Sequence, residues 1–239
     1  MYRLKWDDEL AEVAQAFSDL CDDSKHDDKQ ERITSKFQVV GQNLAFSYES
    51  SDTRTVDGAG RVKDWFDEYK DFSPQNVDPF QVARGPAVLH FTQVTWAQTR
   101  YVGCGYTHYK LQNDPQPQFP FKKLFACNYA PGGNVLRTSM YKVGKTCSEC
   151  PSDTTCDEAT GLCHTPGDPD GIGDSAEAGG LFGGGLWKIA AVLLVGGGVA
   201  VMVGSLLCML KKEPDAAGPP AGALSERRLS RRMAVTQDE

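Results

Sequence analysis

Apolar residues recur at helical spacing in three segments of the first hundred or so positions. Residues 1–17 (MYRLKWDDELAEVAQAF) predict an amphipathic helix, whose apolar face recurs at three- and four-residue steps through Trp6, Leu10, Val13, Phe17 and Leu20. Residues 60–72 (GRVKDWFDEYKDF) predict a second helix with one aromatic face, formed by Val62, Trp65, Tyr69 and Phe72. Residues 85–96 predict a third, because Gly85-Pro86 is a natural helix entry.

The segments between these helices are rich in residues that favour strands. Residues 37–47 (FQVVGQNLAFS) predict a short strand with a local kink at the central Gly-Gln-Asn. Residues 99–111 and 122–133 predict paired strands, and the three prolines of residues 113–121 predict a long connection between them. Interspersed helices and antiparallel strands predict a single α+β domain over residues 1–143.

Half of the eight cysteines lie close together after this domain, at Cys147, Cys150, Cys156 and Cys163. Such a cluster forms either a disulfide knot or a zinc knuckle, and only its first pair has C-x2-C spacing. We assign residues 144–165 to a small cysteine-rich module and favour disulfides over zinc, because of the topology that follows. Residues 166–186, dominated by Gly, Asp and Pro, predict a flexible stalk.

An uncharged run of 22 residues extends from Ile189 to Leu210. At ~1.5 Å a residue a helix of this length spans about 33 Å, enough to cross a bilayer core. We expect a membrane helix over residues 187–210. Lysines and arginines then predict a cytoplasmic tail over residues 211–239, with all preceding residues outside the cell.

That topology requires a targeting signal, and the sequence opens on the amphipathic helix without an apolar targeting segment. Either the natural chain begins upstream of Met1, or the membrane segment itself acts as the signal; we favour the first.

The net charge of −7 argues against nucleic acid as a partner, because neutralising phosphates needs a surplus of Lys and Arg.

Six short motifs, in order, resemble those of the CAP superfamily of cysteine-rich secretory, antigen 5 and pathogenesis-related-1 proteins. Strings LHFTQVTWAQT, YVGCG and LFACNYAPGGN resemble its two main signatures, from which we single out Thr92, Gln93, Trp96, Asn128, Tyr129 and Asn134. The upstream motifs are a histidine-containing turn (Cys21-x4-His26-Asp27), the G-[EQ]-N-[LIV] motif with Gly41 and Asn43, and the glutamate-bearing helix (Trp65-x-x-Glu68). The resemblance covers about Met1 to Tyr141.

This resemblance implies an α-β-α sandwich with helices on both faces of a small antiparallel sheet. It also implies the disulfides Cys104–Cys127, Cys147–Cys156 and Cys150–Cys163, the last two in a hinge module; spacing alone leaves three pairings open for the hinge. The resemblance leaves two alternatives for Cys21, a free thiol or a disulfide to a segment upstream of Met1. A stalk and anchor after the hinge are similar to the glioma pathogenesis-related type.

The family also implies a cleft formed by His26, Gln42, Glu68 and His90, in which the two histidines can hold a divalent cation such as Zn2+. Spacing alone would make His26 a solvated loop residue and His90 a buried, hydrogen-bonded one. Gln42 stands where the family usually has Glu, and an uncharged amide is a poor zinc ligand. Gln42 can still hydrogen-bond to a histidine and fix its tautomer.

Three functions follow from this resemblance. The leading one is a non-enzymatic extracellular binding module, tethered to the membrane, for a cation, a lipid or sterol, or a protein partner. The second is a metal-dependent hydrolase with Glu68 as base and a metal on the histidines. The third, a channel modulator like that of related toxins, is disfavoured because the chain lacks a second cysteine-rich domain.

Overall fold

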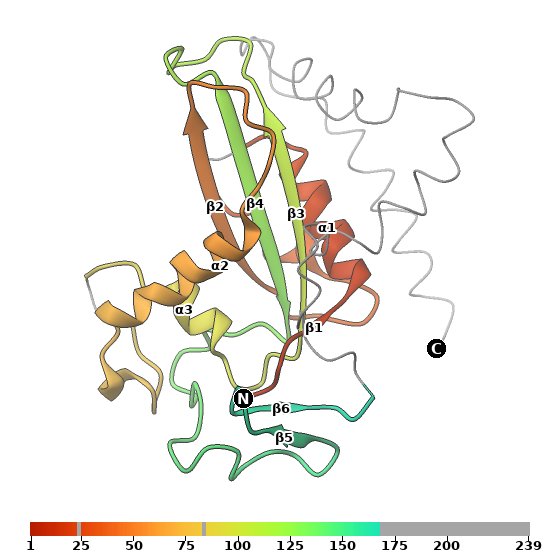
Figure 1. Cartoon of the computed structure of the whole chain (residues 1–239), viewed down its shortest axis with the longest axis vertical. Helices are drawn as coiled ribbons and strands as arrows, with labels where there is room; N and C mark the ends of the chain where they lie inside the picture. Colours follow the sequence, from red (N-terminus) through yellow and green to blue (C-terminus); the bar gives the residue numbers. More distant parts are fainter. Residues whose placement is uncertain (23–24, 83–84, 168–239) are drawn as a thin grey trace.

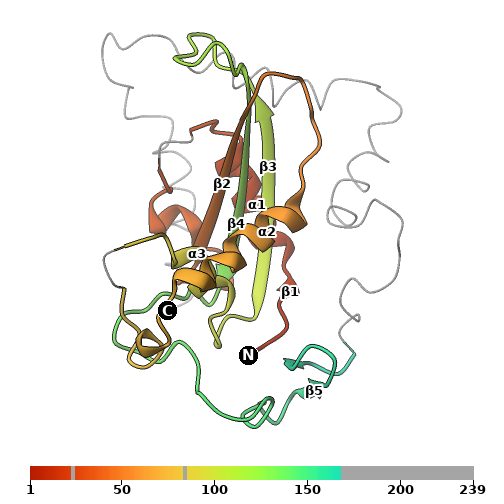
Figure 2. The same ribbon diagram turned by 60° about the vertical axis from the view of Figure 1, so that its left-hand side comes forward.

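The computed structural model describes residues 1–22, 25–82 and 85–167. Its central sheet has four strands in the order β1 (Lys5–Trp6), β3 (Tyr101–Tyr109), β4 (Phe121–Ala130) and β2 (Gly41–Glu49). Helix α1 (Asp8–Ser18) covers one face, and α2 (Gly58–Asp67) and α3 (Leu89–Val94) lie on the other (Figures 1 and 2). The expected α-β-α sandwich is therefore confirmed.

The strands pair almost as the sequence predicts. β4 is antiparallel to both β2 and β3, and Cys104 lies opposite Cys127 in the β3–β4 pair. β1 departs from the expected antiparallel sheet, because it pairs parallel to β3 through Lys5 and Trp6. The predicted kink in the first long strand is wrong: β2 starts at Gly41, and its ladder with β4 runs without interruption to Glu49.

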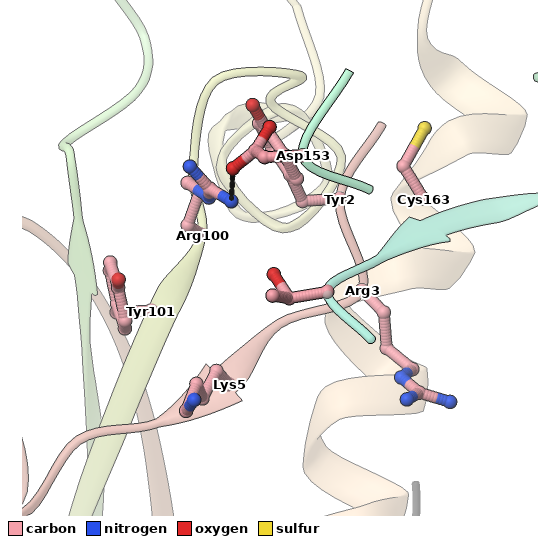
Figure 3. A pocket seen from close by; sticks show the side chains of 8 residues that line it. Tyr2, Arg3, Lys5, Arg100, Tyr101, Asp153 and Cys163 are labelled. Carbon is pink, nitrogen blue, oxygen red and sulfur yellow. Dashed lines mark hydrogen bonds and ion pairs between the residues drawn. The ribbon is translucent and has the colours of Figure 1, made fainter. Parts of the chain in front are cut away.

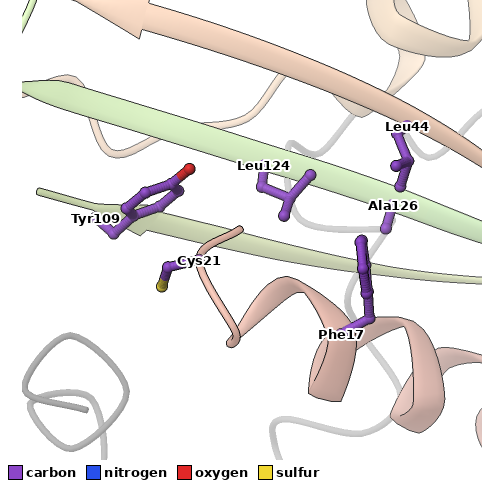
Figure 4. Packing of buried hydrophobic residues seen from close by; sticks show 6 residues of the cluster. All are labelled: Phe17, Cys21, Leu44, Tyr109, Leu124 and Ala126. Atoms are coloured by element: carbon purple, nitrogen blue, oxygen red, sulfur yellow. The ribbon is translucent and has the colours of Figure 1, made fainter. Parts of the chain in front are cut away.

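Alternate residues of β4 form two cores, one on each face of the sheet. Leu124 and Ala126 pack with Phe17 of α1 and Leu44 of β2 (Figure 4). On the opposite face, Phe125, Cys127 and Tyr129 pack around Trp65 of α2. Because successive side chains of a strand point to opposite faces, this one buried strand joins both helical layers.

Two glycines of β3 allow α1 to lie directly on the sheet. A Cβ at Gly103 would lie 2.2 Å from the backbone nitrogen of Ala11, and one at Gly105 would lie 2.3 Å from that of Gln15. The Gln15 side chain then bonds the strand edge, accepting from the Tyr106 N–H and donating to the Tyr106 carbonyl, both at 2.9 Å. The amide thus satisfies backbone groups that an unpaired edge would leave open.

The predicted N-terminal helix begins too early, and only part of its predicted apolar face is buried. Asp7 caps α1 by accepting from the Leu10 N–H at 3.0 Å, so the preceding Trp6 lies in β1 with 40% of its surface exposed. Leu20 lies beyond the helix and is 51% exposed. Leu10 and Phe17 of the predicted face are buried, and Ala14 and Ser18 are the other buried residues of the helix.

The other two predicted helices are shorter than their patterns indicate. α2 ends at Asp67 and is continued by a 3-10 helix, η2 (Glu68–Asp71), so that Tyr69 of the expected aromatic face is 47% exposed and only Trp65 of that face is fully buried. α3 starts at Leu89 rather than at the predicted Gly85-Pro86 entry. Further 3-10 turns lie at Lys29–Arg32 (η1) and Pro74–Asn76 (η3).

The cysteine-rich module folds around a two-stranded sheet of β5 (Thr155–Asp157) and β6 (Leu162–His164). Its disulfides are Cys147–Cys156 and Cys150–Cys163, and the domain contains Cys104–Cys127, which are the pairings that the resemblance implies. The N-terminal segment joins module and domain: Arg3 N–H donates to the Cys163 carbonyl and Cys163 N–H donates to the Met1 carbonyl, both at 2.8 Å.

The expected stalk from residue 168 onward, membrane helix (187–210) and cytoplasmic tail (211–239) lie outside the described residues. Among residues 1–22, 25–82 and 85–167, every helix is too short or too polar to span a bilayer.

The contact between α1 and β3 predicts the effect of substituting Gly105. Gly105→Ala would push a methyl group into the backbone of Gln15, and we expect the free energy of unfolding to fall by about 2–3 kcal/mol, the usual cost of overpacking. Chemical denaturation measures this loss. Gly58→Ala is the matched control, because its Cβ would meet only a Phe125 ring atom at 3.4 Å, and it should leave stability within about 0.5 kcal/mol. Equal stability of the two variants would contradict the close contact.

Candidate histidine site

His26 is held by the side chain of Gln42 at the start of β2. The His26 Nδ1 and Gln42 Oε1 atoms are 2.8 Å apart, and Gln42 Nε2 donates to Asn128 Oδ1 at 3.1 Å. Because Gln42 donates through its nitrogen, its oxygen accepts the proton of His26 Nδ1. The neutral imidazole is therefore fixed as the Nδ1–H tautomer, with a lone pair on Nε2. His26 is exposed, whereas Gln42 and Asn128 are buried.

A buried ion pair lies directly after this histidine in the chain. Asp27 Oδ1 lies 2.7 Å from Arg32 Nε, with side-chain exposures of 8% and 9%. Arg32 also donates to the carbonyls of Asp27 and Val40, both at 3.3 Å, and so ties the His26 turn to the entry of β2. Burial raises the pKa of the Asp27 carboxyl, while Arg32 and a hydrogen bond from Gln42 oppose that rise.

His90 is held by Glu68, which comes from the 3-10 turn after α2. Glu68 Oε1 lies 2.6 Å from His90 Nδ1, while Oε2 accepts the backbone N–H groups of His90 and Phe91, both at 3.1 Å. One carboxylate thus caps the N-terminus of α3 and orients the imidazole on its first turn. The donor at Nδ1 again leaves Nε2 with its lone pair when the ring is neutral.

Two further residues fix the position of His90. The Trp65 ring stacks on the imidazole, with centroids 5.9 Å apart and planes 24° apart. Asn43 Nδ2 donates to the His90 carbonyl at 3.1 Å. Asn43 directly follows Gln42 in β2, so consecutive residues of one strand hold the two histidine segments.

The structure arranges the four predicted site residues as two pairs, His26 with Gln42 and Glu68 with His90. No hydrogen bond joins the pairs directly within the described parts of the chain. Those parts also contain no group of three His, Cys, Asp or Glu side chains arranged to hold a metal. Each pair therefore presents one imidazole whose Nδ1 atom is already hydrogen-bonded and whose Nε2 atom is the nitrogen type that divalent cations bind.

The remaining motif residues build the frame of this site. Buried Gln93 accepts from the Gly133 N–H at 2.9 Å, and a Cβ at Gly41 would lie 2.0 Å from its Oε1, so this position requires glycine. Thr92 donates to Asn134 Oδ1 at 2.6 Å, and Asn134, with a left-handed φ of 59°, donates to the Leu89 carbonyl.

The aromatic motif residues are core. Trp96 packs edge-on against Phe80 with ring centroids 5.2 Å apart. Tyr129 is 1% exposed, and burial raises the pKa of its phenol although a hydrogen bond with Asn43 opposes the rise.

Asp27 and Arg32 are the site residues that motif reasoning missed. Asp27 stands beside His26 in the quoted turn, but a solvated pair and a buried one look alike in sequence. The available signal was an arginine five residues after an aspartate, which is far too common to single out this contact.

The sequence matches the "Cysteine-rich secretory protein family" over residues 1–129. It is 41% identical over 162 residues to "CRISP/Allergen/PR-1" of Trittame loki, covering 67% of this chain and 38% of that protein. It is also 41% identical over 173 residues to "Cysteine-rich venom protein" of Tityus serrulatus, covering 72% of this chain and 39% of that protein. The chain thus spans about two fifths of the length of these curated relatives.

Solved structures share the fold. BmVAL-1 superposes with a TM-score of 0.55 at 30% identity, covering 69% of this chain and 77% of that one. A crystal structure of NaASP2 with Zn2+ has a TM-score of 0.54 at 25% identity, covering 68% of this chain and 76% of that one.

The three hydrogen bonds to Glu68 predict a loss of stability when its carboxylate is removed. Glu68→Ala leaves two backbone N–H groups of α3 and the His90 ring without their acceptor, and we expect the free energy of unfolding to fall by about 2 kcal/mol. Denaturant titration measures it. Asp71→Ala, on the same 3-10 turn and exposed, is the control and should change little. A loss for Glu68→Ala no larger than the control's would refute the cap.

Proposed function

The chain belongs to the cysteine-rich secretory protein (CAP) family, and from this membership we propose that it is a non-enzymatic extracellular binding module. The family match over residues 1–129 and the relatives named as venom and allergen proteins support this proposal. The disulfides of the domain and the hinge also support it, because such bonds persist in oxidising compartments.

The hydrogen bonds that Glu68 already accepts argue for a binding role over hydrolysis. A general base must take a proton from water, and N–H donors already occupy three of the roughly four acceptor positions of the Glu68 carboxylate. Glu68 therefore acts as an orienting and capping residue. His26, held by the neutral Gln42, has no carboxylate partner on its ring to assist proton transfer either.

We assign the two histidines to weak binding of a divalent cation through their Nε2 atoms. The observation that carries this assignment is the pairing of both Nδ1 atoms with acceptors, the arrangement that metal-ligating histidines usually show. The family member NaASP2, solved with Zn2+, supports zinc as the cation to test. Two neutral ligands and no charged one predict modest affinity.

The membrane tether belongs to the same proposal. The apolar run within residues 187–210 would anchor the module, residues 166–186 would act as its stalk, and residues 211–239 would lie in the cytoplasm.

Exposed Phe66 and Tyr69 pack against Phe91 beside the histidine site. This aromatic surface favours a lipid, a sterol or an apolar patch of a protein as the extracellular ligand.

Calorimetric titration of zinc tests the cation site. We expect the full-length, disulfide-intact chain, in detergent micelles and without a histidine tag, to bind one zinc ion with a dissociation constant of about 10–100 µM. His26→Ala and His90→Ala should each abolish the heat of binding, and EDTA should reverse it. His164→Ala, which changes a hinge histidine bonded to Thr155, should bind like the natural sequence. Absence of zinc binding, or its survival in both site variants, would retire the metal role.

Restoring the charge usual in the family should strengthen the site. Gln42→Glu adds a carboxylate at 2.8 Å from the ring of His26, and we expect about tenfold tighter zinc binding in the same titration. Glu49→Gln, which alters charge at the far end of the same strand, serves as the control and should not change the affinity. Unchanged affinity in Gln42→Glu would show that the side chain at this position does not influence metal binding.

A further inference from the structure

A hollow of about 280 Å³ lies where the domain, the N-terminal segment and the cysteine-rich module meet. Its walls come from Tyr2 to Lys5, from the start of β3 and from the module around Asp153 and Thr165. Figure 3 shows Arg100 at one end beside Asp153, Lys5 at the other end, and Tyr101 between them. The hollow is therefore separate from the histidine site, although Tyr101 of the YVGCG motif lines it.

The charges of the hollow are opposite in sign to those of the chain. Among the described residues that line it, three are cationic (Arg3, Lys5 and Arg100) and one is acidic (Asp153), although the chain has a net charge of −7. Tyr2, Tyr101 and Thr165 add hydroxyl groups that can donate to oxygen. This composition suits an anion and is unsuited to a cation or an apolar ligand.

Arg100 retains unused capacity for an anion. Within the described part of the chain its side chain donates one hydrogen bond, from Nη2 to Asp153 Oδ2 at 3.0 Å, and its guanidinium stacks 4.2 Å from the Tyr2 ring centroid. The stacking fixes the plane of the guanidinium, while Asp153 is 58% exposed, so the ion pair is weak and easily exchanged. A second oxyanion can therefore take the place of Asp153 on a donor that is already oriented.

Arg3, which also lines the hollow, has a guanidinium nitrogen without a hydrogen-bond acceptor among the described residues. This nitrogen, Nη2, is buried, and Asp157 Oδ2 lies 4.0 Å from Nη1. Buried guanidinium nitrogens are almost always bonded, because leaving one unbonded is unfavourable. In Figure 3 the guanidinium points away from Arg100, so Arg3 adds positive charge at the edge of the hollow rather than a contact at its centre.

We propose that this hollow is a binding site for a ligand that carries a sulfate or phosphate monoester. Arg100 is its main contact, Lys5 and the hydroxyl groups support the other end, and Asp153 is a built-in competitor for Arg100. The ligand would bridge the domain and the module, because residues of both line the hollow. Sulfated sugars of the cell surface and phosphate esters share this chemistry.

Two substitutions separate this role from a purely structural one. Arg100→Gln and Asp153→Asn break the same ion pair, so a structural role predicts the same change for both. Anion binding predicts opposite changes: about tenfold weaker binding for Arg100→Gln, and severalfold tighter binding for Asp153→Asn because the competitor is removed. The measurement is calorimetry on the full chain in micelles with inorganic sulfate, inorganic phosphate, a heparin-derived disaccharide and glycerol phosphate, at low and at near-physiological salt.

The control is Arg54→Gln, which breaks a comparable exposed pair with Asp52 at 3.2 Å and should leave anion binding unchanged. Tighter binding of the disaccharide than of glycerol phosphate would identify a sulfated glycan as the source, and the reverse would identify a phosphate ester. Equal weakening by Arg100→Gln and Arg54→Gln, equal effects of Arg100→Gln and Asp153→Asn, or no binding of any probe would overturn the proposal. Zinc titration of the same samples reports on the histidine site separately.

Discussion

The backbone contact between α1 and β3 is the constraint on which the rest of the domain depends. Gly103 and Gly105 let the helix approach the strand so closely that the Gln15 side chain can bond the backbone of Tyr106. This contact sets where β3 lies, and the long β3–β4 and β4–β2 ladders then place every other element relative to it. A side chain at either glycine would separate the first helix from the sheet.

The histidine site is a consequence of this frame more than a separate device. Gly41 at the start of β2 leaves room for the Gln93 side chain, and the next two residues, Gln42 and Asn43, reach the two histidine segments. His26 is held by a neutral amide and His90 by a carboxylate, so the two rings have similar hydrogen bonds but partners of different charge. Under the proposed cation role, this difference predicts weaker binding than a member with two carboxylates would show.

Much of the fold could be predicted from sequence, because its strands and glycine-rich motifs are local signals. The β3–β4 pair follows from strand composition around a proline-rich connection, and the module's disulfides follow from the family resemblance. Helix ends could not be predicted, since they depend on contacts from elsewhere: Asp7 stops α1 from including Trp6, and Glu68, distant in sequence, caps α3 at Leu89.

Parts of the candidate site were also beyond sequence reasoning. Motifs named His26, Gln42, Glu68 and His90, yet only the three-dimensional structure shows that they form two pairs. No motif singles out the buried Asp27–Arg32 pair or the cationic hollow around Arg100, because burial and the convergence of distant segments decide them. Such features arise from tertiary packing, and composition does not reveal them.

The central claim is that Gln42 and Glu68 fix both imidazoles as Nδ1–H tautomers, with Nε2 available to a ligand. Long-range nitrogen–proton correlation NMR of histidine-labelled protein measures the tautomer of each neutral ring directly. The account predicts the Nδ1–H pattern for His26 and His90, a loss of that pattern for His26 alone in Gln42→Ala, and zinc-induced shifts at Nε2. An Nε2–H pattern at either ring in the natural sequence would contradict it.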